Sequence, residues 1–386
     1  MNSKLIFTAI ALPFLAVVFA FATTGVFTPP PIPGSHDVLP GAQRIHLPDA
    51  VGPESLVFDP SDGGPYTGVA DGRILKWDGG DWVEFAVTSS QRHVLSHSIQ
   101  QWSMYVEGRS ARFHNKTGDL YIADAYLGLQ EVGPTGGMAS QLVTEVEGQH
   151  LRFTNDMDID EEKNVIYFTD SSTEFYRRYF WINYSEVSSF RIFSSAFEFM
   201  QSILTIDKTG KLMKYDISTK QVTVLLRGLA FANGVALSKD RSFLLVSETT
   251  KRRILRFWLE GPNAGKHDTF AELAGFPDNI RRNSDGEFWV ALHSKAGLLA
   301  QWATSYSLFG SALFKLPLNF KQLHYLFVGC KPHATAIKMS NEGKILRVLE
   351  DVEGKTLRFI SEVEEKNGKL WIGSVLMPYI GIYTLQ

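Results

Sequence analysis

A strand–turn–strand unit recurs along this chain, and the recurrence limits the folds that are open to it. When Asn155-Asp156, Asn233-Gly234 and Asp278-Asn279 are aligned, the segments "MDIDEEKNVIYFTD", "VALSKDRSFLLVSE" and "IRRNSDGEFWVALH" fall into register. Each segment gives a short strand, a polar turn and a second apolar strand. The same template fits "ESLVFDPSDGGPYTGVADG", with Glu54 first, and also "SARFHNKTGDLYIADA" and "ISEVEEKNGKLWIGSV". Six such units, spaced by about 40 to 80 residues, predict a repeat architecture.

The repeat favours an all-β fold with radial symmetry. Helical periodicity is scarce after residue 40, where short β-rich runs such as "VIYFTD" and "FLLVSE" are separated by Gly, Asp, Asn and Lys clusters. This pattern favours many short antiparallel strands over an alternating βαβ chain. Four-stranded sheets around a central channel accommodate six units in 386 residues. We therefore predict a six-bladed β-propeller with short helical insertions over residues 46–386; the alternative is an all-β sandwich with similar turns.

The N-terminal residues 1–27 are typical of a targeting segment. Lys4 precedes an uncharged, mostly apolar run that extends to Phe27, with Ala20-Phe21-Ala22 as a small-x-small cleavage site. The run is also long enough to span a bilayer, so we expect either a cleaved signal peptide or a membrane anchor. Either one sends the chain into the secretory pathway: the endoplasmic reticulum lumen, a vacuole or the cell exterior. The proline-rich residues 28–45 are expected to form an extended linker.

Sequons, cysteine content and charge agree with a secreted globular protein. The sequons that begin at Asn115 and Asn183 are candidate N-glycosylation sites. The single cysteine, Cys330, allows no intrachain disulfide, so the fold must rest on its core and on any metal that it binds. A formal net charge of -3 gives no electrostatic case for nucleic acid as a partner.

The first position of the repeat carries oxygen donors in four units. These donors are Glu54, Asn155, Asn233 and Asp278, with Asn279 beside the last. The innermost strand of each propeller blade lines the channel, so radial symmetry would bring them to one end of the axis. Turn chemistry would explain any one of them alone. Together, two carboxylates and three amides form a hard oxygen set that suits Ca²⁺ better than zinc, and we predict a shared Ca²⁺ site.

Several segments resemble the plant strictosidine synthase-like family. The matching segments are "GPESLVFD", "HNKTGDLYIADAYLGL", "LRFTNDMDID", "YFTDSS", "FANGVALS", "FWLEGPNAGK" and "FPDNIRRNSDGEFWVALH", and the likeness runs from about Gly52 to the C-terminus. The resemblance implies a six-bladed propeller that enters the secretory pathway. It also implies kinship with the paraoxonases, in which a Glu, two Asn and an Asp-Asn pair hold a catalytic calcium. Those positions match the five residues named above.

Departures from the family pattern limit the expected reaction. Strictosidine synthase, an enzyme of alkaloid biosynthesis, depends on a glutamate in its last blade, where our register puts Ser361, next to Glu362. It also lacks the Asn and Asp-Asn ligands that this chain has, so the chain resembles the hydrolase branch. The paraoxonase histidine dyad is not evident, because Ala125 stands where its second member would be expected. A second, buried calcium would want an acid beside Glu54, where Ser55 stands, so we do not predict that site, although Asp156 remains a candidate to contribute to it.

The expected function is therefore that of a Ca²⁺-dependent hydrolase of small esters or lactones. The metal would polarise a carbonyl group while a general base activates water. His293, His150 and Asp156 are the candidate bases. Apolar insertions at residues 174–204 and 296–329 are candidates to form a pocket or lid for a small hydrophobic substrate.

Two other functions remain open from the sequence. The first is an alkaloid-pathway condensing enzyme whose acid/base groups have moved. The second is a propeller that binds a ligand without turnover and keeps its metal for structure. A retained N-terminal segment would add membrane association to any of the three.

Overall fold

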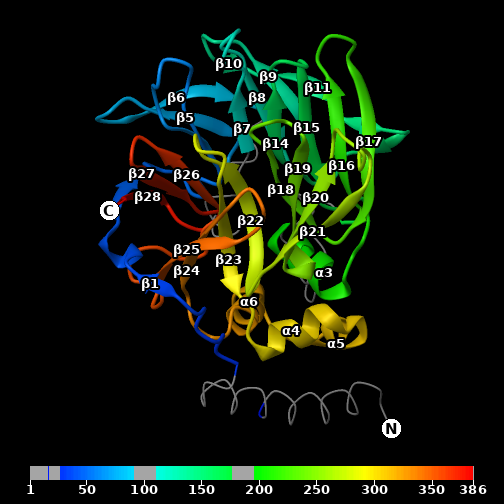
Figure 1. The fold of residues 1–386 in the computed structure, drawn as a ribbon. Coiled ribbons are helices and arrows are strands. Elements are labelled where there is room, and N and C mark those ends of the chain that lie inside the picture. The colour runs from blue at the N-terminus through cyan, green and yellow to red at the C-terminus, as the bar shows by residue number, and fades with distance from the viewer. Residues whose placement is uncertain (1–15, 17–26, 91–109, 176–194, 386) are drawn as a thin grey trace, which may run out of the picture.

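The computed structural model describes residues 27–90, 110–175 and 195–385, together with Ala16. The strands of these residues form six large sheets around a central axis, and a group of helices lies at one end (Figure 1). This arrangement confirms the predicted six-bladed β-propeller with short helical insertions. The predicted signal peptide or anchor lies outside the described residues, apart from Ala16 and Phe27, and so does Asn183.

Each blade begins with its inner strand and continues outward along the chain. Blade one contains β3 (Leu56–Val57), β4 (Tyr66–Gly68), β5 (Arg73–Trp77) and β6 (Trp82–Val87), with β10 (Gly137–Met138) parallel to β6. Blade two contains β7 (Ser110–Phe113), β8 (Leu120–Asp124), β9 (Gly128–Val132) and β11 (Ser140–Val143), and the hairpin of β12 (Glu145–Val146) and β13 (Gln149–His150) follows it. Blade three contains β14 (Thr154–Asp160), β15 (Val165–Asp170), β16 (Gly210–Asp216) and β17 (Gln221–Leu229).

The remaining blades follow the same plan. Blade four contains β18 (Ala232–Leu237), β19 (Phe243–Glu248), β20 (Arg253–Trp258) and β21 (His267–Glu272), with the 3-10 turn η2 (Thr249–Lys251) between β19 and β20. Blade five contains β22 (Gly275–Arg282), β23 (Phe288–Lys295), β24 (Ala334–Met339), β25 (Ile345–Asp351) and β1 (Ser35–Asp37). Blade six contains β26 (Glu362–Lys366), β27 (Lys369–Gly373), β28 (Tyr379–Thr384) and β2 (Gln43–His46).

Residues 28–45, which we expected to be a linker, contribute to the propeller. They carry β1, the 3-10 turn η1 (Leu39–Gly41) and most of β2. β1 pairs parallel with β25, and β2 pairs antiparallel with β28, the last strand of the chain. An N-terminal strand therefore completes the last blade and closes the ring between the two ends of the chain.

The second strands of blades three and four are buried on both faces because each blade packs between two others, whereas outer strands such as β17 and β21 are partly exposed. Every residue of β15 ("VIYFTD") and of β19 ("FLLVSE") is buried. A sheet with one solvated face would alternate polar and apolar residues, as antiparallel sheets commonly do. The continuous apolar runs seen in the sequence therefore follow from the stacking of blades around an axis.

A two-residue bulge near the start of three inner strands explains the recurrent Asx pairs. The ladder skips from Thr154 to Met157 in β14, and it makes equivalent skips in β18 and β22. A bulge leaves its extra residues unpaired and re-aims their side chains. We call the two skipped residues the first and second positions; they are Asn155 and Asp156, Asn233 and Gly234, and Asp278 and Asn279.

The buried residue after each bulge fixes the register of the other blades. In blade three, the buried Met157 follows the first and second positions directly. Val363 in β26 is equally buried, so the two residues before it, Ser361 and Glu362, take the first and second positions of blade six. Leu56 is the matching buried residue of blade one, so Glu54 and Ser55 occupy its two positions. Ser110 lies at the second position of blade two.

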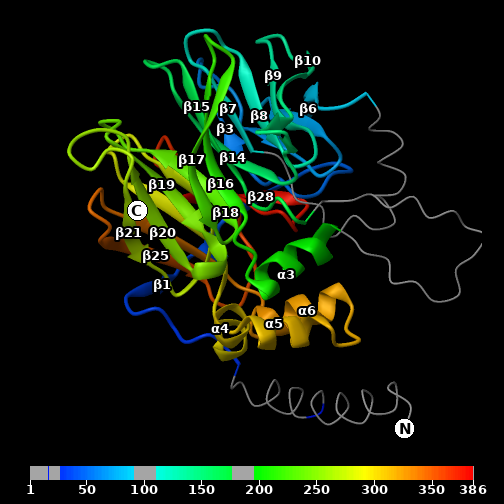
Figure 2. The same ribbon diagram turned by 90° about the vertical axis from the view of Figure 1, so that its right-hand side faces the viewer.

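Four helices form a cap at one end of the propeller, which we call the helical cap. They are α3 (Ser195–Thr205), α4 (Leu298–Ser305), α5 (Ser307–Phe314) and α6 (Phe320–Phe327). They pack against one another in both views (Figures 1 and 2). A shared apolar cluster joins Leu204 and Leu299 of the cap to Phe231 and Phe276 of blades four and five. The described helix of the first insertion, α3, and the three helices of the second thus lie over the same end of the tunnel.

Among the described residues, no helix has the length and apolar character needed to cross a bilayer.

Candidate metal centre and histidine pair

Four of the five expected metal ligands line one small cavity beneath the helical cap. Glu54, Asn155, Asn233 and Asp278 form part of its wall, together with Phe199, Phe231, Thr249, His293 and Val375. The volume of the cavity is about 20 Å³, which is room for one ion or water molecule. Asn279, the fifth expected ligand, does not line this cavity. It is completely buried at the second position of blade five, next to Asp278.

The asparagine side chains leave buried oxygens that the protein itself does not satisfy. Among the described residues, the Oδ1 atoms of Asn155, Asn233 and Asn279 are buried and accept no hydrogen bond. The nitrogen ends of two of these amides are held: Asn155 Nδ2 donates to Ser171 Oγ (2.9 Å), and Asn279 Nδ2 donates to Glu362 Oε2 (3.2 Å).

An unsatisfied buried oxygen costs about 1–3 kcal/mol, so the two that belong to cavity-lining residues, Asn155 and Asn233, indicate a missing partner such as a cation.

The two carboxylates of the set also need a counter-charge. The pKa of Asp278 is raised well above its usual value, first by burial and then by the charge of Glu54. Two buried carboxylates close together oppose each other's ionisation unless a cation neutralises them. No three His, Cys, Asp or Glu side chains of the described residues gather in an arrangement that could hold a metal. The donor set depends on amides instead, and hard oxygen donors of this kind fit Ca²⁺.

His293 lies beside this donor set and forms a pair with a second histidine. Its Nδ1 is 4.0 Å from Asp278 Oδ2, and its Nε2 is 3.0 Å from Nε2 of His324. His293 comes from β23 and His324 from α6 of the helical cap. The ring of Phe359 stacks on His293, and the ring of Phe320 stacks on His324.

Burial keeps both histidines neutral. It lowers the pKa of His293 to about 4, with a smaller effect from His333, and it lowers the pKa of His324 well below its usual range. In the Nε2–Nε2 contact one ring must donate and the other must accept. We assign the donor to His293, which leaves its Nδ1 able to accept a proton on the side of Asp278.

Sequence reasoning proposed His293 and missed His324. His324 is the fifth residue of a short amphipathic helix in an insertion, and no motif marks it. Only the packing of α6 against blade five brings it to His293.

The other two candidate bases do not line the metal cavity. His150 is exposed on β13, where it borders a separate hollow beside Leu127 and Leu151. Asp156 lies inside the tunnel, and both of its carboxylate oxygens accept from Arg281, at 2.6 and 2.8 Å. Of the three candidates, the structure brings only His293 to the expected ligands.

A buried guanidinium occupies the middle of the tunnel. Arg281 is 4% exposed, binds Asp156 with both terminal nitrogens and forms an ion pair with Glu362. Glu362 also accepts from the backbone N–H of Leu56 (2.6 Å) and from the side chain of Asn279. An internal cation therefore lies between the acids at the second positions of blades three and six.

Asn115, a candidate glycosylation site, is exposed near the far end of the tunnel. Its backbone N–H and its Nδ2 both donate to Glu161 Oε1, at 2.7 and 2.6 Å.

Comparison with known proteins places the chain in a family. A model described as strictosidine synthase matches residues 182–262, and one described as the N-terminal part of strictosidine synthase-like proteins matches residues 37–77. Protein strictosidine synthase-like 10 of Arabidopsis thaliana is 56% identical over 98% of both chains. The chain belongs to the strictosidine synthase-like family. Strictosidine synthase-like 3 of the same plant is 45% identical over 90% of this chain and 86% of its own length.

Solved structures share the fold of this strictosidine synthase-like protein at low sequence identity. A gluconolactonase from Xanthomonas campestris is 15% identical, with a TM-score of 0.55 over 93% of this chain and 95% of that chain. A calcium-binding protein, regucalcin, from Agrobacterium tumefaciens is 11% identical, with a TM-score of 0.54 over 89% of this chain and 93% of that chain. At this level of identity the likeness establishes the common fold.

Proposed function

We propose that this strictosidine synthase-like protein is a Ca²⁺-dependent hydrolase of small esters or lactones. One observation carries the proposal: buried, unpaired amide oxygens and two carboxylates lie at one end of the tunnel, beside a neutral histidine. Proteins that share the fold include one named a gluconolactonase and one named a calcium-binding protein, and both names support the proposal.

The five oxygen-bearing residues would hold the ion: Glu54, Asn155, Asn233, Asp278 and Asn279. Bound Ca²⁺ would supply a Lewis acid for the carbonyl oxygen of the substrate. His293 accepts a proton from the attacking water at Nδ1, while its Nε2–H remains donated to His324. Phe359, stacked on His293, fixes the plane of the imidazole. The low polarity around both rings keeps His293 unprotonated, which is the state in which Nδ1 can accept a proton.

The proposed substrate is a small hydrophobic molecule. Phe199 and Phe231 line the cavity, and the helical cap covers it with further apolar side chains. A cavity of about 20 Å³ is too small for an ester, so a substrate would enter only when the helical cap moves.

The condensation catalysed by strictosidine synthase fits this site less well. Ser361 occupies the first position of blade six, and its hydroxyl donates to the carbonyl oxygen of Glu54 (2.7 Å). The adjacent Glu362 is tied to Arg281, Leu56 and Asn279 deeper in the tunnel. Neither residue therefore offers a free carboxyl group for acid/base work at the cavity.

The test is an assay of the purified full chain against a panel of lactones and aryl esters, with Ca²⁺ and with chelator. We expect Asn233→Ala and Asp278→Ala to lower kcat/KM by at least about 100-fold. Asn263→Ala, in an exposed turn between β20 and β21, is the matched control and is expected to keep full activity. Full activity of both ligand variants would overturn the proposal.

We further propose that the protein works in the secretory pathway, glycosylated at Asn115 and Asn183. A glycosidase shift that Asn115→Gln and Asn183→Gln abolish would support glycosylation. Extraction of the native protein with carbonate would separate a retained anchor from a cleaved signal.

A further inference from the structure

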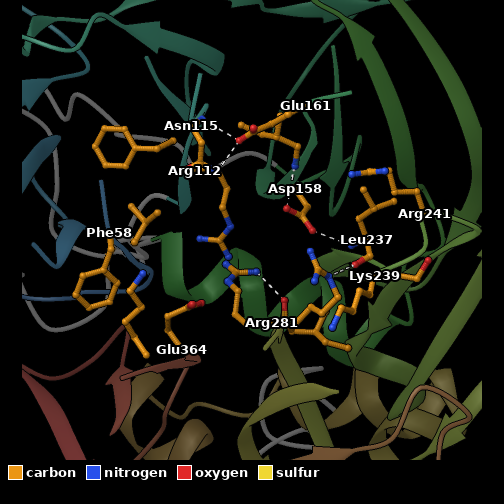
Figure 3. Close-up of a pocket in the computed structure, with 17 residues that line it drawn as sticks. Phe58, Arg112, Asn115, Asp158, Glu161, Leu237, Lys239, Arg241, Arg281 and Glu364 are labelled. Carbon is orange, nitrogen blue, oxygen red and sulfur yellow. Dashed lines mark hydrogen bonds between the residues drawn. The ribbon is translucent and has the colours of Figure 1, made fainter. Parts of the chain in front are cut away.

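The end of the tunnel away from the helical cap opens into a polar hollow of about 340 Å³, which we call the distal hollow (Figure 3). The inner strands supply its floor, because their residues beyond the bulge point into the tunnel. Arg112, Asp158, Arg281 and Glu364 come from four different blades in this way. The volume lies at the small end of the range for pockets that bind small molecules.

Cationic side chains outnumber acidic ones in this hollow. Six cations line it, against three acids. The cations are Arg112, Lys239, Arg241, Arg281, Arg282 and Lys366, and the acids are Asp158, Glu161 and Glu364. Of the cations, Arg241 and Lys366 form ion pairs with acids outside the hollow, while Arg281 is held by Asp156 and Glu362.

Three of the cations bind only carbonyl oxygens among the described residues. Arg112 Nη1 donates to Ala111 O (2.8 Å), Arg282 Nε donates to Leu237 O (2.8 Å) and Lys239 Nζ donates to Ser284 O (2.8 Å). The Nη2 atom of Arg112 is buried and has no partner in that part of the chain. A guanidinium nitrogen withdrawn from water without an acceptor is unfavourable, so this atom indicates an absent anion.

Among the described residues, the acids of the distal hollow form no ion pair with these three cations, although burial is outweighed at Arg112 by nearby charges, those of Glu364 and Asp158 among them, which favour its charged form and raise its pKa. Asp158 accepts from the backbone N–H groups of Leu237 (2.7 Å) and Ile159 (2.9 Å), and Glu161 accepts from Asn115. Burial raises the pKa of Glu364 to about 8, so this carboxyl group is largely protonated at neutral pH.

The floor of the hollow is formed by two guanidinium groups that approach from opposite sides. Figure 3 shows Arg112 entering from one side and Arg281 from the other, with their planar ends toward each other at the centre. Asp156 and Glu362 hold Arg281 from the tunnel side, and its Nε is also unpaired among the described residues. An oxyanion above the pair would neutralise the charge of Arg112 and accept from the unpaired nitrogens of both groups.

We propose that the distal hollow binds a small oxyanion, a carboxylate or phosphate group, with Arg112 on the floor and Lys239 and Arg282 at the rim. The geometry carries this assignment: three cations that form no ion pair among the described residues line a cavity large enough for a small molecule, and one of them has a buried nitrogen without an acceptor. The site does not depend on the metal centre, which lies at the other end of the tunnel.

Isothermal titration calorimetry of the full chain at constant ionic strength tests the proposal, with inorganic phosphate and citrate as probes. We expect at least one probe to bind, and Arg112→Gln to weaken it at least 10-fold, which is the usual worth of a charge-assisted hydrogen bond. The double variant Lys239→Gln/Arg282→Gln should weaken binding by a similar factor. Because both residues are exposed, the double variant should fold and can test the site even if Arg112→Gln does not fold.

Lys266→Gln is the charge-matched control, because Lys266 is exposed in the β20–β21 turn and does not line the hollow. It should bind like the wild type. Binding of phosphate alone would indicate a phosphate ester as the ligand, and binding of citrate alone a carboxylic acid; either result supports the site. No binding of either probe, or equal weakening in Lys266→Gln and the variants of the hollow, overturns the proposal.

Discussion

Replacing Asp278 with Asn is expected to change the stability of the protein in opposite directions with and without Ca²⁺. The carboxyl group is buried, and its pKa is raised well above the usual value by burial and by Glu54. A carboxyl group whose folded-state pKa is raised contributes stability at low pH and loses that contribution as the pH rises through the folded-state pKa. At high pH in chelator, Asp278→Asn removes this cost and should melt above the wild type.

With Ca²⁺ the order should reverse. At a free Ca²⁺ concentration 100-fold above Kd, binding stabilises the wild type by about 2.7 kcal/mol. An unfolding entropy of about 2.1 cal/mol/K per residue, over a propeller of roughly 340 residues, gives about 0.7 kcal/mol/K, so Tm should rise by about 4 °C. If the lost carboxylate ligand raises Kd about 100-fold, the same Ca²⁺ stabilises the variant by only about 0.4 kcal/mol, less than 1 °C in Tm.

The assay is thermal unfolding followed by circular dichroism near pH 8, at one scan rate and fixed ionic strength, in EGTA and across a Ca²⁺ titration. Asp285→Asn is the control, because Asp285 is exposed in the next turn and its substitution removes the same charge. This control should respond to Ca²⁺ as the wild type does. An equal Ca²⁺ response in Asp278→Asn, or a melting temperature below that of the wild type in EGTA, would refute the reasoning.

Three other predictions follow from the same contacts. His293→Gln should lower kcat for ester hydrolysis about 100-fold and His324→Gln about 10-fold, both with unchanged Ca²⁺-dependent melting; equal activity to the wild type would contradict the histidine pair. Burial raises the pKa of Asp170 to about 7, so the wild type should lose stability between about pH 4 and pH 7, and Asp170→Asn should flatten that profile in urea titrations. Gly234→Ala should lower the free energy of unfolding by about 1–3 kcal/mol and weaken Ca²⁺ binding, because the new Cβ would lie 2.6 Å from Asn279 Cα. A variant as stable as the wild type would contradict this, because it would show that β18 and β22 can move apart at this point.

The radial fold and the candidate ligand set could be predicted because their signals are local and repeated. The apolar runs of β15 and β19 and the paired residues of the bulges lie within single blades, and each pattern occurs several times. The register of each inner strand can therefore be assigned by aligning the blade sequences with one another. The same comparison gave Ser361 its place in the last blade, where the buried Val363 follows it two residues later.

Contacts between distant segments could not be predicted in this way. "SHD" and "QRIH" have no strong strand pattern, yet they form β1 and β2 because blades five and six offer open edges to them. Asp156 appeared available as a base until Arg281, 125 positions away, was found to hold both of its oxygens. His324 likewise depends on α6 folding back onto β23.

The sequence by itself determined the number of blades and the oxygen-bearing side chains that four of them present at one end of the tunnel. A repeated local pattern can be recognised in the sequence without information on long-range contacts, because each blade buries its strands in the same way. Only the tertiary structure decided which charged groups are neutralised and which remain available. Asp156 is paired within the tunnel, His293 has His324 as its partner, and Arg112 is left with an unpaired nitrogen among the described residues. These outcomes depend on distances between single side chains that are far apart in the chain. Such pairs produce no periodic pattern in the sequence, so the sequence alone does not predict them.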